Sequence, residues 1–117
     1  STYYLGLQSF AFTATQGDRK LYFRKAGTIT GCNLYTNTGS GTAGSGEAWT
    51  INVRLNATTD YSIAAVSVAG KERVWNNQSM SITVADGDYI EIKTTTPAFA
   101  TAPTGWITSG YITFKPN

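Results

Sequence analysis

The chain has 117 residues, the size of a single domain that can bury a sizeable core. Only 14% of the residues are charged and the formal net charge is +2, so the composition gives no indication of a nucleic-acid partner. No apolar run is long enough to span a membrane, and the surface must be covered mainly by neutral polar side chains. Such a surface suits an extracellular or virion protein, or a subunit that hides part of its surface in an oligomer.

The first part of the chain predicts three strands. Leu5–Thr13 carries apolar residues that change face midway, which indicates a bend or a bulge. Leu21–Phe23 is a short second strand, and Gly27–Thr36 is a third. In the third strand the apolar positions change phase around Gly31, and a glycine inside a strand pattern commonly marks a β-bulge.

A loop rich in glycine and serine over Asn37–Glu47 separates these strands from the cleanest strand pattern in the sequence. In Trp49–Asn56 every second residue is apolar. A turn over Asn56–Asp60, with Asn56 as a turn former, leads into Tyr61–Val68, where the apolar residues again change phase midway. Both segments therefore predict strands.

The stretch Ser79–Lys93 predicts a central hairpin. Apolar and polar residues alternate in both of its halves, on either side of Asp86-Gly87. Asp-Gly is a strong hairpin signal because a tight turn needs residues that tolerate positive φ. Thr94–Gly105 contains two prolines and is expected to be a loop, and Trp106–Phe114 is the last predicted strand.

No segment has the periodicity of a helix, so we predict an all-β fold without significant helix. About eight or more short strands, separated by turn signals, indicate an antiparallel two-sheet sandwich of jelly-roll type. Residues 1–4 are expected to be a lead-in from a preceding segment, and residues 5–117 to form one sandwich domain. The predicted core consists of Trp49, Ile51, Val53, Leu55, Ile63, Val66, Met80, Ile82, Val84, Ile90, Ile92, Ile112 and Phe114.

The sequence argues against an enzyme. Because the chain has no histidine, it offers neither a Ser-His or Cys-His nucleophile nor an imidazole metal site, and the single Cys32 can form no internal disulfide. Asp86 and Asp88 lie in one turn, where turn formation explains them better than the acid–base pair of a glycosidase. No Asp-x-Asp-x-Asp loop supplies the oxygens that calcium needs, so we expect no metal and no cofactor.

A tryptophan beside amides and a guanidinium is the strongest candidate binding site, because a sugar can stack on an indole while the polar groups bind its hydroxyls. Arg73–Gln78 is the densest such segment, and the turn at residues 60–61 is expected to approach it. The predicted ligand contacts are Trp75, Asn76, Asn77, Arg73, Asp60 and Tyr61. Burial of Trp75 in the core or in a subunit interface is the competing interpretation. Trp106 and Tyr111 form a second candidate site, for which burial is the simpler account.

Three segments also resemble a known family. Trp49–Asn56, Ser81–Lys93 and Gly110–Phe114, with a proline-containing loop before the last strand, are similar to the small jelly-roll domains at the tips of bacteriophage tail fibres and phage-derived bacterial fibres. The resemblance covers about Ala26–Phe114. It implies a homotrimeric adhesin at the tip of an extracellular fibre or virion, with a surface glycan or protein as its receptor. Binding residues differ from tip to tip in this family, so the resemblance assigns no site residue.

These observations lead to one main hypothesis and two alternatives. The main hypothesis is a non-enzymatic, trimeric fibre-tip domain that recognises a cell-surface carbohydrate, without nucleic-acid binding or membrane insertion. The first alternative is a structural trimerisation or assembly domain of a virion or fibre. The second alternative is a monomeric carbohydrate-binding module of a secreted glycosidase. Oligomer mass separates the last from the other two, and a glycan array separates the first two.

Overall fold

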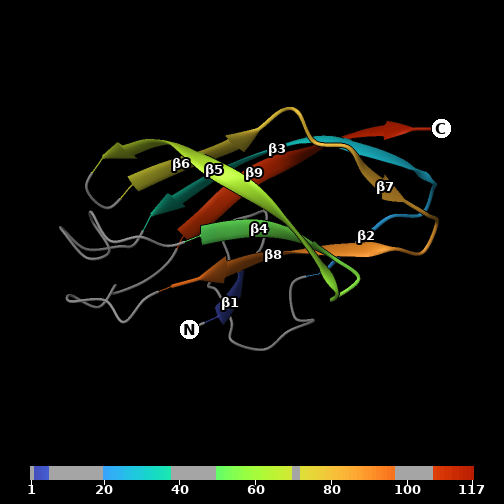
Figure 1. Cartoon of the computed structure of the whole chain (residues 1–117), viewed down its shortest axis with the longest axis horizontal. Helices are drawn as coiled ribbons and strands as arrows, with labels where there is room; N and C mark the ends of the chain where they lie inside the picture. The colour runs from blue at the N-terminus through green and yellow to red at the C-terminus, as the bar shows by residue number, and fades with distance from the viewer. Residues whose placement is uncertain (1, 6–19, 38–49, 70–71, 97–106) are drawn as a thin grey trace.

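The computed structural model describes residues 2–5, 20–37, 50–69, 72–96 and 107–117 (Figure 1). These residues form nine strands and no helix, and none of them belongs to a helix that could cross a membrane. The strands are β1 (Thr2–Leu5), β2 (Leu21–Tyr22), β3 (Gly27–Asn37), β4 (Thr50–Leu55), β5 (Thr59–Ala69), β6 (Glu72–Asn77), β7 (Ile82–Val84), β8 (Tyr89–Thr95) and β9 (Ile107–Pro116). All their pairings are antiparallel, so the prediction of an all-β, antiparallel fold is confirmed.

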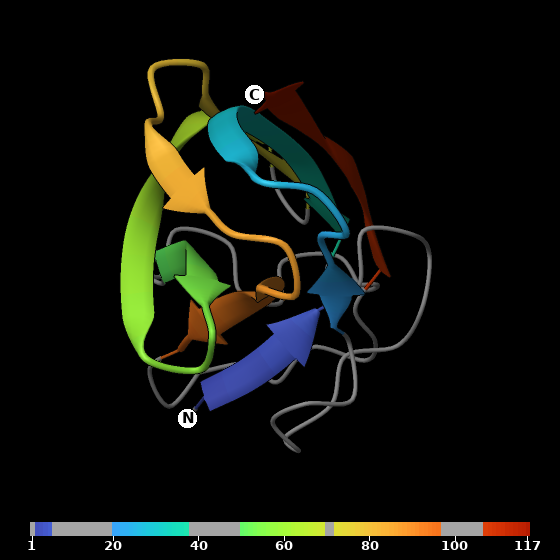
Figure 2. The ribbon, with the colours of Figure 1, turned by 90° about the vertical axis from the view of Figure 1, so that its right-hand side faces the viewer.

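The strands form one curled sheet in the order β1-β8-β4-β5-β6-β3-β7, with β2 added to β8 and β9 added to β3. β5 carries the sheet from one half to the other, because residues 59–63 pair with β4 whereas residues 64–69 pair with β6. In Figure 2, seen along the long axis, the strands surround a common core as an open half-barrel.

The turn at Asp86-Gly87 joins the two halves of the sheet instead of two neighbouring strands. β7 pairs with β3, whereas β8 pairs with β1, β2 and β4, so the predicted central hairpin is wrong. Gly87 has a φ of +95°, which agrees with the expected need for positive φ. A third segment holds the turn at this corner, because Phe23 N donates to Asp88 O at 2.8 Å and Gly87 N donates to Phe23 O at 2.7 Å.

The predicted bulge at Gly31 is present. The register between β3 and β9 shifts between Ile29 and Gly31, which leaves Thr30 as the extra residue. Beyond the bulge, Cys32 and Leu34 face inward and are fully buried. Burial raises the pKa of the Cys32 thiol to about 12, so this side chain stays protonated and acts as a small apolar core residue.

The core lies between the two halves of the sheet and contains most of the predicted residues. Its buried apolar members are Phe23, Ile29, Cys32, Leu34, Ile51, Val53, Ile63, Trp75, Met80, Ile82, Val84, Ile90 and Ile92. Three further predicted residues are partly buried and pack against this cluster, namely Leu55, Ile112 and Phe114. Both halves of the sheet therefore contribute apolar side chains to a single core.

Two further predictions differ from the structure. Val66 is 60% exposed instead of buried, because the register shift between Ala65 and Ser67 makes it the extra residue of a bulge. The expected change of phase in this strand is present, and Val66 is the bulge residue that points outward. Thr2–Leu5, most of which was expected to be a lead-in, is strand β1 and pairs with β8. Trp49, a predicted core residue, lies outside the described residues.

Asn56 and Ala57 form the tight turn between β4 and β5. Both have positive φ, of 50° and 59°, and Thr58 N closes the turn by donating to Leu55 O at 3.0 Å. The Asn56 side chain also joins this hairpin to the corner turn: its Nδ2 donates to Asp88 Oδ1 and its Oδ1 accepts a hydrogen bond from Tyr89 N, both at 3.0 Å. The prediction of Asn56 as a turn former is confirmed.

Candidate functional site

Trp75 is buried in the core of the protein. Its side chain is 2% exposed, and its indole Nε1 donates to Thr36 Oγ1 at 3.0 Å. β6 lies between β5 and β3 and is paired on both sides, so it is not an edge strand. The indole face is therefore not available for stacking on a sugar. The prediction of Trp75 as a ligand surface is wrong, and the competing interpretation of burial in the core is correct.

Arg73 shares the inner face of β6 with Trp75, because strand residues two positions apart point the same way. It is 7% exposed, so it also does not offer its guanidinium to a surface ligand. This end of the interior is polar, and its buried threonines are Thr36, Thr94, Thr96 and Thr108. Within the described part of the chain, the buried Thr108 hydroxyl has no hydrogen-bond partner.

Asn76 and Asn77 point to opposite faces of β6. Asn76 lies on the outer face, where its Oδ1 accepts a hydrogen bond from Gln78 Nε2 at 2.7 Å. Asn77 ends the strand, where its Nδ2 donates to Ser62 O at 3.3 Å and its Oδ1 accepts from Ser79 N at 2.9 Å. The residues predicted around the tryptophan therefore do not form one site.

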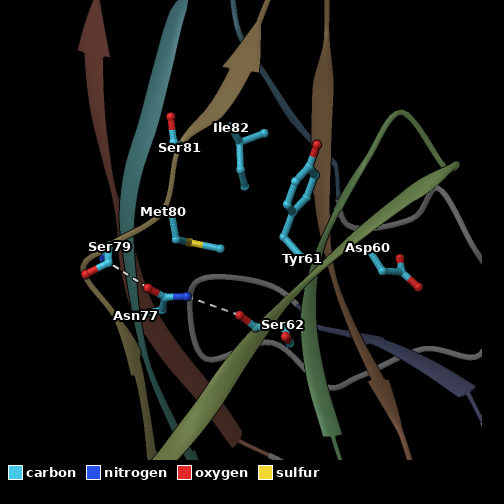
Figure 3. Close-up of a pocket in the computed structure, with 8 residues that line it drawn as sticks. All are labelled: Asp60, Tyr61, Ser62, Asn77, Ser79, Met80, Ser81 and Ile82. Carbon is cyan, nitrogen blue, oxygen red and sulfur yellow. Dashed lines mark hydrogen bonds between the residues drawn. The ribbon is translucent and has the colours of Figure 1, made fainter.

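Asn77 instead belongs to a surface pocket that also contains Asp60 and Tyr61. The pocket has a volume of about 370 Å³ and lies beside β7, where β5 leaves β6 to pair with β4 (Figure 3). Its lining residues are Asp60, Tyr61, Ser62, Asn77, Ser79, Met80, Ser81 and Ile82. Residues 60 and 61 thus approach the end of β6, as expected from the sequence, although the tryptophan is not part of the pocket.

The pocket has an apolar floor and a polar rim. Met80 and Ile82 are buried core residues, and Tyr61 is half-buried against the same core. Figure 3 shows these three side chains directed into the space between β5 and β7. Three exposed serines place hydroxyl groups at the edge, Ser62, Ser79 and Ser81. Such a lining suits a small ligand that has both an apolar face and hydroxyl groups.

Asp60 lies at one end of the pocket and is held by two cations. Its Oδ1 accepts a hydrogen bond from Arg54 Nη1 at 2.8 Å, and its Oδ2 accepts one from Lys93 Nζ at 2.9 Å. Partial desolvation raises the pKa of this carboxyl, but the bonds from Lys93 and Arg54, together with their charges, outweigh it and hold the pKa below its ordinary value. Asp60 is therefore ionised at neutral pH, and both of its oxygens are already bonded.

The Asp60 pKa is lower in the folded chain than in the unfolded chain, so its contribution to stability is present above the unfolded pKa and is lost as the pH falls through the folded pKa. We expect Asp60→Asn to lower the free energy of unfolding at neutral pH. The difference from the wild type should shrink as the pH falls below about 4. Urea unfolding of both proteins over a pH series measures this difference in the free energy of unfolding. Asp86→Asn is the control, because the Arg24–Asp86 pair is 85% and 59% exposed, and an equal pH dependence in both variants would contradict this role.

The second candidate pair is only partly within the described residues. Trp106 lies outside them, whereas Tyr111 is 54% exposed on β9. The simpler expectation of burial is therefore wrong for Tyr111. Tyr111 lies opposite Asn33 of β3, and Asn33 also lies opposite Asn76 of β6. Asn76, from the first candidate site, and Tyr111, from the second, thus share the outer face of the sheet, away from the pocket.

Sequence reasoning missed the serines of the pocket and Asn33. Ser79 and Ser81 flank buried Met80, which predicts that they face outward, but this pattern carries no signal for a pocket. Ser62 is brought to Asn77 only because β5 changes partner at this point. Local patterns therefore predict which way these side chains point and not what they lie beside.

Within the described part of the chain, no group of three or more His, Cys, Asp or Glu side chains is placed to hold a metal ion. Comparisons with protein-family models, with curated proteins and with solved structures found no match. The interpretation of the pocket therefore rests on its geometry and chemistry.

Proposed function

We propose that this chain is a non-enzymatic receptor-binding domain that recognises a cell-surface carbohydrate in the pocket of Tyr61. The observation that carries the proposal is the half-buried Tyr61 ring above an apolar floor, beside serine hydroxyls and the Asn77 amide. A sugar presents C–H groups to an apolar or aromatic surface and hydroxyl groups to a polar rim. The pocket offers both kinds of contact and needs no cofactor for them.

The charges around the pocket support binding without catalysis. Asp60 is the single acidic residue among the described residues that line the pocket. Glycoside hydrolysis ordinarily uses two carboxyl groups that flank the bond to be cleaved. Asp60 is also bonded through both oxygens by Arg54 and Lys93, so it is not poised to exchange a proton with a ligand.

We further propose that the two halves of the curled sheet correspond to the two sheets of a jelly-roll, and that three copies form the tip of an extracellular fibre or virion. The 14% content of charged residues supports a surface that is partly covered by other copies. Exposed apolar side chains on two strands, Leu21 at 40%, Tyr22 at 53% and Val66 at 60%, support the same proposal. A single site on the order of millimolar affinity gains strength when three sites bind one cell surface.

A glycan array followed by calorimetric titration tests the pocket. We expect the wild type to bind a glycan and Tyr61→Ala to weaken this binding about tenfold or more. Ser81→Gln fills the pocket from an exposed position and is expected to weaken binding without removing a core contact. Tyr22→Ala is the matched control, because it removes an exposed tyrosine ring that does not line the pocket.

The outcomes separate the possible functions. Unchanged binding in both Tyr61→Ala and Ser81→Gln would exclude the pocket as the glycan site. A stable trimer that binds no glycan would favour a structural assembly domain, which the exposed apolar side chains of β2 also fit. A stable monomer that binds a glycan would favour a carbohydrate-binding module of a secreted enzyme. Analytical ultracentrifugation gives the oligomer mass.

A further inference from the structure

The outer face of β6, β3 and β9 carries a line of uncharged side chains that lies outside the pocket. By register, Asn76 lies opposite Asn33, and Asn33 lies opposite Tyr111 on the next strand. Ala64 of β5 continues the line on the other side of Asn76. Because neighbouring strands are about 4.8 Å apart, the line extends about 14 Å across the sheet. A continuous sheet holds these side chains in fixed relative positions.

Three amides of this face, those of Asn33, Asn76 and Gln78, are here called the amide row, and Asn33 lies directly opposite Tyr111. Gln78 Nε2 donates to Asn76 Oδ1 at 2.7 Å, which orients both groups. Gln78 lies over Gly31, where a Cβ atom would collide with the Gln78 Oε1. The bulge glycine therefore makes room for this amide.

Among the described residues of β3, β6 and β9, the charged side chains of the outer face lie away from the amide row. On the outer face of β6 and β9, Glu72 and Lys115 lie at the ends of the strands, and Glu72 Oε1 already accepts a hydrogen bond from Tyr35 OH at 2.7 Å. The ion pairs of Asp60 with its two cations belong to the other half of the sheet. The amide row is thus neutral, with donors and acceptors beside the exposed ring of Tyr111.

We propose that the amide row and Tyr111 bind a neutral oligosaccharide that lies across the strands. The Tyr111 ring contacts the C–H face of one sugar, and the amides exchange hydrogen bonds with hydroxyl groups of the neighbouring sugars. This site is on a different face from the pocket and does not depend on it. A second copy of the chain fits the row less well, because protein interfaces centre on apolar and aromatic residues and would leave buried amides in need of partners.

Nuclear magnetic resonance tests the binding of an oligosaccharide to the amide row directly, because each Asn and Gln side-chain amide gives its own signals. The probes are maltohexaose, cellohexaose and chitohexaose as neutral oligosaccharides and an oligogalacturonate as an acidic one, each titrated to about 10 mM. With at least one neutral probe, we expect saturable shifts of the Asn33, Asn76 and Gln78 amide signals and of the Tyr111 ring signals. The acidic probe is expected to leave these signals in place.

Variants locate the contact. Tyr111→Ala is expected to weaken binding of the neutral probe about tenfold. Gly31→Ala is expected to weaken it as well, because the added Cβ displaces the end of the Gln78 side chain, which is flexible enough to move without unfolding the strand. Ser109→Ala is the matched control, since it changes another exposed residue on the same face of β9 and lies opposite Tyr35, which is not part of the amide row. Ser81→Gln, in the pocket, is expected to leave the shifts of the amide row unchanged.

Three results would overturn the proposal. The first is the absence of shifts in the amide row with all the neutral probes. The second is an unchanged affinity of the Tyr111→Ala variant for the neutral probe, when its spectrum shows that the variant is folded. The third is the appearance of the same shifts without sugar when the protein concentration is raised, which would identify this face as a contact between copies of the chain.

Discussion

Replacing Trp75 by alanine is expected to lower the free energy of unfolding by about 3–5 kcal/mol. The side chain is 2% exposed, so its removal exchanges a large apolar contact for a cavity. It also leaves the Thr36 hydroxyl without the indole hydrogen bond inside the core. Trp75→Phe retains most of the apolar contact and should lose only about 1–2 kcal/mol. Urea unfolding followed by fluorescence and circular dichroism measures both variants.

Val74→Ala is the matched control, because Val74 is the half-buried neighbour of Trp75 on the outer side of the same strand. It should cost clearly less than Trp75→Ala. A Trp75→Ala protein with wild-type stability and lost glycan binding would contradict the core position and restore the tryptophan as a ligand surface. Wild-type glycan binding in a destabilised Trp75→Phe protein would agree with the core position.

The strands and most of the core could be predicted because their signals are local. Ile51 and Val53 alternate with polar residues, and the structure buries both in β4. The same argument holds for Ile82 and Val84 in β7. The bulge at Gly31 could also be predicted, since an extra residue shifts the apolar pattern within a few positions.

Strand pairing could not be predicted in the same way. Asp86-Gly87 provides the positive φ that a turn needs, but both a hairpin and a corner between two halves of a sheet satisfy that requirement. The structure forms a corner, in which the backbone of Phe23, about sixty residues away in the chain, is hydrogen-bonded to the turn. No pattern within Ser79–Lys93 contains this information. The sequence therefore predicted a hairpin where the structure has a corner between the two halves of the sheet.

The candidate site shows the same limit. Once Trp75 is placed inward, alternation puts Asn76 outward and Asn77 inward, which separates residues that are adjacent in sequence. Asn77 reaches Ser62 because β5 crosses between the halves of the sheet at that point, and Asn76 lines up with Tyr111 through a third strand. The chemistry of each residue was readable from its type, whereas its neighbours depend on the register of distant strands.

Replacing Gly110 by alanine is the other change with a large expected effect. Gly110 of β9 lies opposite Leu34 of β3, and an added Cβ would collide with the backbone oxygen of Asn33 and lie 2.6 Å from Leu34 Cδ2. β3 is also paired with β6, so it cannot move away without disturbing a second pairing. We expect Gly110→Ala to lower the free energy of unfolding by about 3 kcal/mol, the upper part of the range for overpacking.

Ser109→Ala is the control for this variant, because the neighbouring Ser109 is exposed and an alanine there should change the free energy of unfolding by no more than about 0.5 kcal/mol. Urea unfolding of the two variants separates a steric collision from a general effect of alanine on β9. The collision involves backbone atoms, which a side-chain rotation cannot relieve. Equal stability of Gly110→Ala and Ser109→Ala would contradict the close approach of β9 to β3. It would also contradict the pairing that places Tyr111 opposite Asn33, on which the proposed oligosaccharide site depends.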